Sequence, residues 1–161
     1  MTQQLSNMSA PAIAPDSPTA HDGMTQHAAK SATAAGTRAL RVIRLLVGVN
    51  LGLVGLQALS AGAFLSGNGR AVTAHALVSV ALQVGALLQA VAAVVQWRRR
   101  RVPAWVAGVS LGLLTLVFLQ AGLGHSKRYW LHVPLGVALC GGLVRQASRL
   151  EALRRAGDER T

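Results

Sequence analysis

Four long runs of apolar residues dominate the chain, and they occupy positions 42–65, 71–97, 102–122 and 129–147. Each run is about as long as the roughly 20 residues that an α-helix needs to cross the hydrocarbon core of a bilayer. Because backbone N–H and C=O groups in lipid must find partners within the chain, we expect every run to be helical. The pattern therefore predicts an all-α integral membrane protein with four spans.

The connections between these runs are short, at residues 66–70, 98–101 and 123–128. Short links make sequence neighbours antiparallel, so we expect an up-down-up-down four-helix bundle over residues 38–150. Most of the 17 glycines fall in the apolar runs, where a missing side chain lets helices approach closely in a bilayer.

The segments outside the bundle differ in composition. Residues 1–37 are rich in Ala, Ser, Thr, Pro and Gln and show no apolar period, which predicts a disordered tail with two solvated histidines, His21 and His27. This tail lacks the basic start, apolar region and cleavage site of a signal peptide, so the first apolar run would direct membrane insertion. Residues 151–161 are predicted to form a short C-terminal tail.

Composition supports the same class, because 52% hydrophobic against 13% charged residues is too apolar for an ordinary soluble domain. The lipid bilayer is thus the expected partner. The single cysteine, Cys140, excludes an intrachain disulfide framework and a cysteine-based zinc cluster. No acidic residue lies in an apolar run, which argues against a proton-coupled exporter; the five acidic residues are Asp16, Asp22, Glu151, Asp158 and Glu159.

The net charge of +11 is distributed in a way that indicates topology. The basic residues punctuate the apolar runs instead of forming a patch, so we expect no nucleic-acid partner. Arg70, Lys127 and Arg128 lie on one side of the bundle, and the positive-inside rule places the opposite side and both termini in the cytoplasm, with the chain in the plasma membrane. That opposite side has thirteen basic residues: Lys30, Arg38, Arg41, Arg44, the arginines at 98–101, Arg145, Arg149, Arg154, Arg155 and Arg160.

Two histidines interrupt the apolar runs at similar depth. His75 lies near the outer end of the second run, and His132 lies near the outer end of the fourth. Each is preceded by a similar segment, LQALSAG with Gln57 and LQAGLG with Gln120. The chain thus resembles two related hairpins, although aligning both pairs leaves loops of different length.

Histidine is uncommon inside membrane helices and needs a hydrogen-bond or ligand partner. One interpretation is packing, with each imidazole bonded to Gln57, Gln120, Ser79 or a backbone carbonyl. The other is joint ligation of a metal. Two histidines without a nearby cysteine or carboxylate make an incomplete zinc site, whereas a porphyrin brings four ligands of its own. We therefore predict axial ligation of b-type haem iron by His75 and His132.

Other residues near the histidines fit this prediction. Gly136, one turn after His132, would clear space for the macrocycle, and Ser79 holds the equivalent position after His75. His125 in the outer loop is a weaker alternative ligand. The basic residues that could pair with the haem propionates are Arg70, Lys127 and Arg128.

The arrangement from Gln57 to Ala147, with histidines 57 residues apart, resembles one four-helix half of haem A synthase. It is also similar to a family of small, uncharacterised four-helix bacterial membrane proteins. The resemblance implies axial haem ligation by His75 and His132. Members often carry an acidic residue and paired cysteines in the first outer loop, and SGNGRAVT at 66–73 has neither. The resemblance therefore does not extend to synthase activity.

Two classes of function remain. The first is a haem-binding membrane protein in electron transfer or haem handling, with a redox or haem-handling membrane partner. The second is a non-catalytic scaffold or accessory subunit whose histidines only pack helices. The sequence shows no nucleophile with a base, no phosphate-binding glycine loop and no metal-hydrolase motif, so it favours a protein that is not an enzyme.

Overall fold

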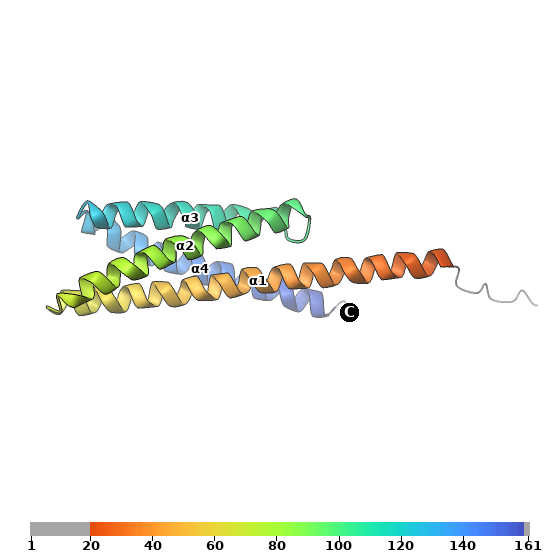
Figure 1. Cartoon of the computed structure of the whole chain (residues 1–161), viewed down its shortest axis with the longest axis horizontal. Helices are drawn as coiled ribbons and strands as arrows, with labels where there is room; N and C mark the ends of the chain where they lie inside the picture. The colour runs from red at the N-terminus through yellow and green to blue at the C-terminus, as the bar shows by residue number, and fades with distance from the viewer. Residues whose placement is uncertain (1–19, 160–161) are drawn as a thin grey trace, which may run out of the picture.

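A computed structural model describes residues 20–159 and contains four α-helices joined by short turns (Figure 1). The helices are α1 (Ala20–Leu65), α2 (Arg70–Arg98), α3 (Ala104–His125) and α4 (Tyr129–Asp158). Residues 20–159 contain no β-strand. The prediction of an all-α four-helix fold is therefore confirmed.

The helices form a closed bundle in which each packs against its two neighbours. Sequence neighbours are adjacent, α1 packs against α4, and neither α1 and α3 nor α2 and α4 approach one another closely along their backbones. Successive helices run in opposite directions (Figure 1). Consequently α2 and α4 occupy diagonal corners, and side chains from both can meet only across the bundle centre.

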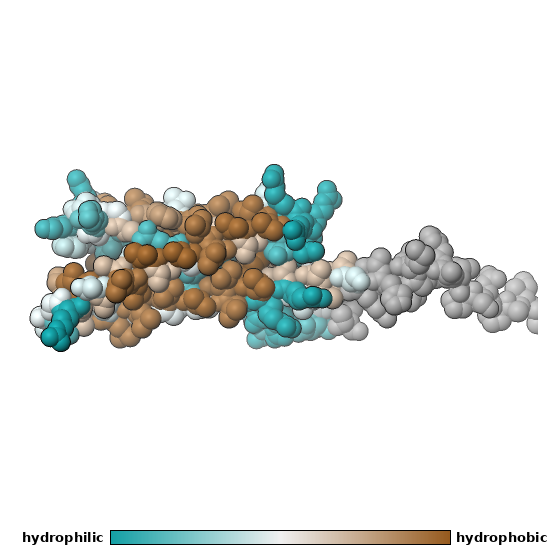
Figure 2. All heavy atoms as spheres, viewed as in Figure 1, coloured by the Kyte–Doolittle hydropathy of each residue, from teal (hydrophilic) through white to brown (hydrophobic). Residues whose placement is uncertain are grey.

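The face of the molecule in Figure 2 has an apolar band with hydrophilic residues at both ends. Three helices are long and apolar enough to cross a membrane, namely α2, α3 and the part of α1 from Ser31 to Leu65. The sequence predicted four such spans. Helix α4 is not among these three, because Arg145 and Gln146 follow closely on an apolar run that already contains His132 and Pro134. The fold is that of a membrane protein, and the crossing by α4 stays a prediction.

Two helices extend beyond their predicted limits. Helix α1 begins at Ala20, within the segment expected to be disordered, and α4 continues through most of the predicted C-terminal tail. Several alanines between positions 28 and 35 account for the first difference, because alanine favours helix even where no apolar period is present. In α4, Leu150 is buried and Leu153 packs against the core. Residues 1–19 and the side chains of His21 and His27 lie outside the described part.

The core has the same spacing on α2 and α4. Starting from His75 and His132, buried positions recur seven, eleven, fourteen and eighteen residues later, which is the heptad spacing of a helix seam. Every position on α2 matches one on α4 that is 57 residues further along the chain. These buried residues are Leu82, Ala86, Gln89 and Ala93 on α2 and Leu139, Leu143, Gln146 and Leu150 on α4.

The turns of the two hairpins also match. Ser66 and Ser126 each donate a hydroxyl hydrogen bond of 2.9 Å to the carbonyl four residues earlier. The next residues, Gly67 and Lys127, both have positive φ, at 92° and 58°. The two outer loops, which were expected to differ in length, are thus equivalent turns. The two hairpins differ instead in the number of helical residues between the turn and the aligned glutamine or histidine. The first hairpin has three more residues on each side, because Gln57 lies nine residues before Ser66 whereas Gln120 lies six before Ser126.

Candidate functional site

The two histidines predicted to form a pair lie next to one another. The ring centroids of His75 on α2 and His132 on α4 are 6.3 Å apart, and the ring planes are inclined by 61°. Both residues are half-buried. Since α2 and α4 are diagonal in the bundle, the imidazoles meet across its centre, close to the end formed by the two matching turns. We call this end the histidine end.

Each imidazole contacts the preceding helix of its own hairpin. The Nδ1 atom of His132 lies 2.9 Å from the backbone oxygen of Gln120, and that of His75 lies 3.2 Å from the backbone oxygen of Gln57. The hydroxyl of Ser60 donates to the same Gln57 oxygen and is 3.1 Å from His75 Nδ1. A carbonyl oxygen can only accept, so we assign a proton to Nδ1 of His132, whose partner is the Gln120 carbonyl.

The side-chain amide of Gln57 completes the surroundings of His75. In the orientation that satisfies both of its ends, its nitrogen donates to the backbone oxygen of His75 at 3.0 Å and to Nδ1 at 2.8 Å, and its oxygen accepts from the Ser79 N–H at 2.9 Å. The Nδ1 atom of His75 is therefore in contact with a donor, the Gln57 amide, as well as with the accepting oxygen of the Gln57 carbonyl.

The Nε2 atoms differ from Nδ1 in having no hydrogen-bond partner within the described residues. A histidine whose Nδ1–H donates to a carbonyl holds its lone pair on Nε2, which is the tautomer commonly found in metal ligands. The arrangement at His132 is therefore chemically able to coordinate a metal, and the same tautomer of His75 would leave its Nε2 available as well. Among the described residues no three His, Cys, Asp or Glu side chains gather into such a site, so a metal bound here would need ligands from elsewhere.

Two glycines make room around His132. A Cβ on Gly124 would lie 2.9 Å from the Cε1 atom of the His132 ring, so the imidazole packs where a side chain would stand. A Cβ on Gly136 would lie 2.8 Å from the Gln120 amide nitrogen. The space beside Gly136 is thus occupied by the Gln120 side chain. The sequence had predicted a porphyrin macrocycle in that space. The Oε1 atom of Gln120 is buried and has no hydrogen-bond partner among the described residues.

The rim of the histidine end is basic and exposed. Arg70 begins α2, Arg128 precedes α4, and the His132 N–H bonds to the Arg128 carbonyl at 3.0 Å. Within residues 31–159, no carboxylate pairs with either of them or with Lys127. His125 is exposed at the end of α3. Three basic side chains near the pair are therefore free to meet an anion.

A second polar layer lies deeper in the bundle and was missed by the sequence analysis. Gln89 and Gln146 follow His75 and His132 by fourteen residues each. The Gln89 amide nitrogen donates to Gln146 Oε1 at 3.0 Å, and its oxygen accepts from Asn50 at 2.8 Å. Ser110 Oγ accepts from Gln146 at 2.9 Å. Asn50, Gln89, Ser110 and Gln146, which we call the glutamine layer, are all 1% exposed. The repeated spacing between histidine and glutamine was the signal that could have revealed this layer.

No protein-family model, curated protein or solved structure matches this chain. The resemblance drawn from Gln57 to Ala147 thus stays a prediction. Function must be inferred from the geometry of the histidine pair and its surroundings.

Proposed function

We propose that this membrane protein binds b-type haem through His75 and His132 near one end of the bundle. The observation that carries the proposal is a pair of imidazoles on diagonal helices whose Nε2 atoms have no hydrogen-bond partner in residues 31–159. The ring centroids lie 6.3 Å apart, so one group held between the two rings would be within reach of both imidazoles.

The surrounding residues are compatible with a haem. The carbonyls of Gln57 and Gln120 would hold the ring orientation of each ligand. The Gln120 amide would have to swing away from Gly136 to admit a macrocycle, and its oxygen has no hydrogen bond that this movement would break. Arg70, Lys127 and Arg128 would pair with the propionates.

Haem iron would supply one-electron chemistry, and two histidine ligands leave it no open position. The proposal therefore favours electron transfer or haem handling with a membrane partner over catalysis on a substrate. The haem A synthase half and the small bacterial four-helix proteins remain the families whose Q…G…H pattern the chain resembles.

We further propose that all four helices cross the plasma membrane with both termini in the cytoplasm. Helix α4 packs beside α3 and α1, and its polar Gln146 faces the bundle interior while valines such as Val133 and Val137 are exposed. The sequence has thirteen basic residues on the opposite side of the apolar runs, which supports this orientation. A reporter fused after Thr161 should be cytoplasmic and one inserted at residues 66–70 should be external; the reverse result would invert the topology.

Absorption spectroscopy of the purified protein supplemented with haem tests the ligation. We expect a low-spin b-type spectrum, and replacing either histidine by alanine should give a high-spin spectrum or lose the haem. His125→Ala is the matched control, because it removes an exposed histidine at the same end of the bundle. Unchanged haem content and spin state in both His75→Ala and His132→Ala would contradict the proposal.

The alternative is a scaffold or accessory subunit whose histidines only pack helices. It is favoured by the Nδ1 contacts, which join α1 to α2 and α3 to α4 without any cofactor. In that case a folded protein would stay colourless with haem. Each alanine substitution would then cost only about 1 kcal/mol of stability, the scale of an interhelical polar contact in a membrane.

A further inference from the structure

A cavity of about 510 Å³ lies at the end of the bundle opposite the histidines. It is enclosed by α1, the connection between α2 and α3, and the last turns of α4. Its walls include four arginines, Arg41, Arg44, Arg101 and Arg154, and one carboxylate, Asp158. The lining therefore has a clear excess of positive charge.

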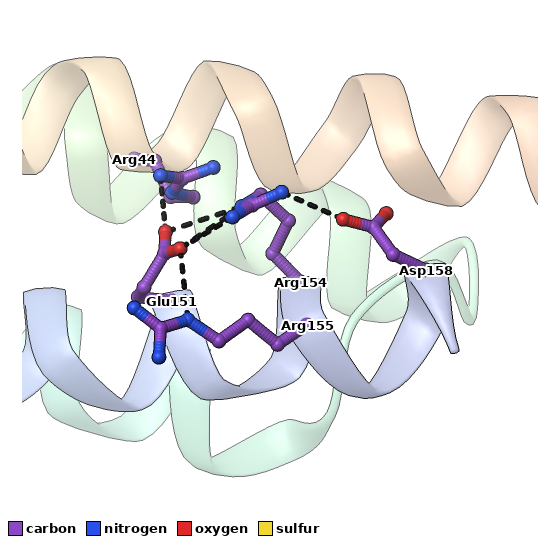
Figure 3. Close-up of polar contacts among 5 residues, drawn as sticks. All are labelled: Arg44, Glu151, Arg154, Arg155 and Asp158. Atoms are coloured by element: carbon purple, nitrogen blue, oxygen red, sulfur yellow. Dashed lines mark hydrogen bonds and ion pairs between the residues drawn. The ribbon is translucent and has the colours of Figure 1, made fainter. Parts of the chain in front are cut away.

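The four arginines fall into two groups. Arg44 and Arg154 both pair with Glu151, and Arg154 also binds Asp158 at 2.6 Å (Figure 3). Arg41 and Arg101 have no carboxylate partner in residues 31–159, and the hydrogen bond found for Arg101 is a weak one of 3.4 Å to Gln96. Two guanidinium groups at the cavity are thus available for an anion.

The cavity has an apolar wall as well as a charged one. Leu40, Val102 and Leu153 line it beside the arginines. It also lies where the apolar band gives way to the hydrophilic end of the bundle (Figure 2). A ligand that fits both walls carries an anionic group next to a hydrocarbon chain. Such a ligand must reach the cavity from the membrane surface.

We propose that this cavity binds the phosphate of an anionic phospholipid from the adjoining leaflet. Guanidinium groups form paired hydrogen bonds with phosphate oxygens, and basic pockets between membrane helices commonly receive lipid head groups. Arg41 and Arg101 bind the phosphate, and Leu40, Val102 and Leu153 contact the start of the acyl chains. The proposal is independent of haem binding, because the cavity and the histidines lie at opposite ends of the bundle.

Native mass spectrometry of the full chain in detergent tests this site. Phosphatidylglycerol should be retained as a bound copy, and phosphatidylcholine at the same concentration should not. Arg41→Gln and Arg101→Gln should each weaken phosphatidylglycerol binding by about tenfold, the equivalent of one charged hydrogen bond. Both arginines are exposed, so neither substitution disturbs the core. Arg99→Gln is the matched control, because it removes the same charge from the same connection outside the cavity lining.

Three results would overturn the proposal. Equal losses in Arg41→Gln, Arg101→Gln and Arg99→Gln would indicate diffuse attraction to the basic end. Equal retention of phosphatidylcholine and phosphatidylglycerol would show that the net negative charge of the head group is not recognised. Binding of inorganic phosphate that depends on Arg41 and Arg101, without retention of lipid, would assign the cavity to a soluble phosphate compound.

Discussion

The histidine pair and the glutamine layer occupy equivalent positions on the same two helices, yet they bond in opposite ways. They are fourteen residues apart, about 21 Å along a helix axis. Gln89 bonds to Asn50 on α1 and to Gln146 on α4, and Ser110 adds α3, so this layer joins all four helices. The hydrogen bonds of His75 and His132 stay within their own hairpins.

The difference separates a layer whose polar groups bond to one another from a pair that leaves two ring nitrogens without partners among the described residues. The glutamine layer uses most of its donors and acceptors on itself, and only Asn50 Oδ1 lacks a partner among the described residues. The two histidines contact one another across the bundle only through their rings, and neither Nε2 atom has a hydrogen-bond partner among the described residues. If polar residues were present here only to hold helices together, the glutamine layer would already do so. The imidazoles are better suited to bind something that neither hairpin supplies.

The largest expected effect on stability comes from removing the centre of the glutamine layer. Gln89→Ala leaves the Asn50 amide and Gln146 Oε1 without their partners, and we expect a loss of about 2 kcal/mol in the free energy of unfolding. His75→Ala in the haem-free protein should cost less, because its hydrogen bonds lie within one hairpin. Reversible unfolding in mixed micelles measures both variants. A larger loss for His75→Ala would reverse the roles assigned to the two layers.

Glycine substitutions test the same contrast more finely. A Cβ on Gly85 would stand 2.3 Å from Asn50 Oδ1, and Asn50 is fully buried and bonded to Gln89, so Gly85→Ala should cost about 1 kcal/mol, the lower end of the cost of overpacking. A Cβ on Gly136 would meet the end of the flexible Gln120 side chain. Gly136→Ala should therefore cost less in the haem-free protein and lower haem affinity instead. Equal unfolding energies and unchanged haem titration for the two variants would remove the distinction.

The smallest effect concerns the ion pairs between α1 and α4 outside both layers. Hydrogen bonding and charge attraction from Arg154, with Arg155 and Arg44, lower the pKa of Glu151 from 4.5 to about 2 (Figure 3). Because the folded pKa is depressed, the stabilisation is present above pH 4.5 and is lost as the pH falls toward 2.

Wild type should thus melt slightly above Glu151→Gln at neutral pH, and the two melting temperatures should converge between pH 4.5 and 2. The effect is small because these side chains are partly exposed. The histidine pair and the glutamine layer contain no carboxylate, so they do not contribute to this dependence on pH. A difference in melting temperature that persists at pH 2 would show that Glu151 stabilises the protein through packing.

Much of the fold was readable because apolar length alone predicts membrane helices. The four runs correspond to the four helices, and the histidine pairing followed from matched depth. The start of α1 was missed because a segment rich in alanine lacks an apolar period yet forms helix readily. Helix α4 was predicted to span the membrane like the other three helices, although Arg145 and Gln146 shorten its apolar stretch.

The glutamine layer and the Glu151 cluster were harder to predict for a physical reason. Asn, Gln and Ser are common enough in membrane helices that single positions carry no signal, and only the spacing of fourteen residues on both helices distinguishes Gln89 and Gln146. Glu151 was predicted to lie in the C-terminal tail, whereas the continued α4 brings it against Arg44 on α1. That contact depends on where the helix ends, which composition predicts poorly.

The constant offset of 57 residues between the seams of α2 and α4 has a consequence for the bundle's origin. A twofold axis makes each residue near it meet its own copy, so histidine would face histidine and glutamine would face glutamine. At the bundle centre His75 lies against His132, and Gln89 bonds to Gln146. A homodimer of one ancestral hairpin, later fused into a single chain, would produce the same arrangement. After such a fusion the two halves would be free to diverge, which fits the longer arms of the first hairpin and the hydrogen bond from Asn50 to Gln89.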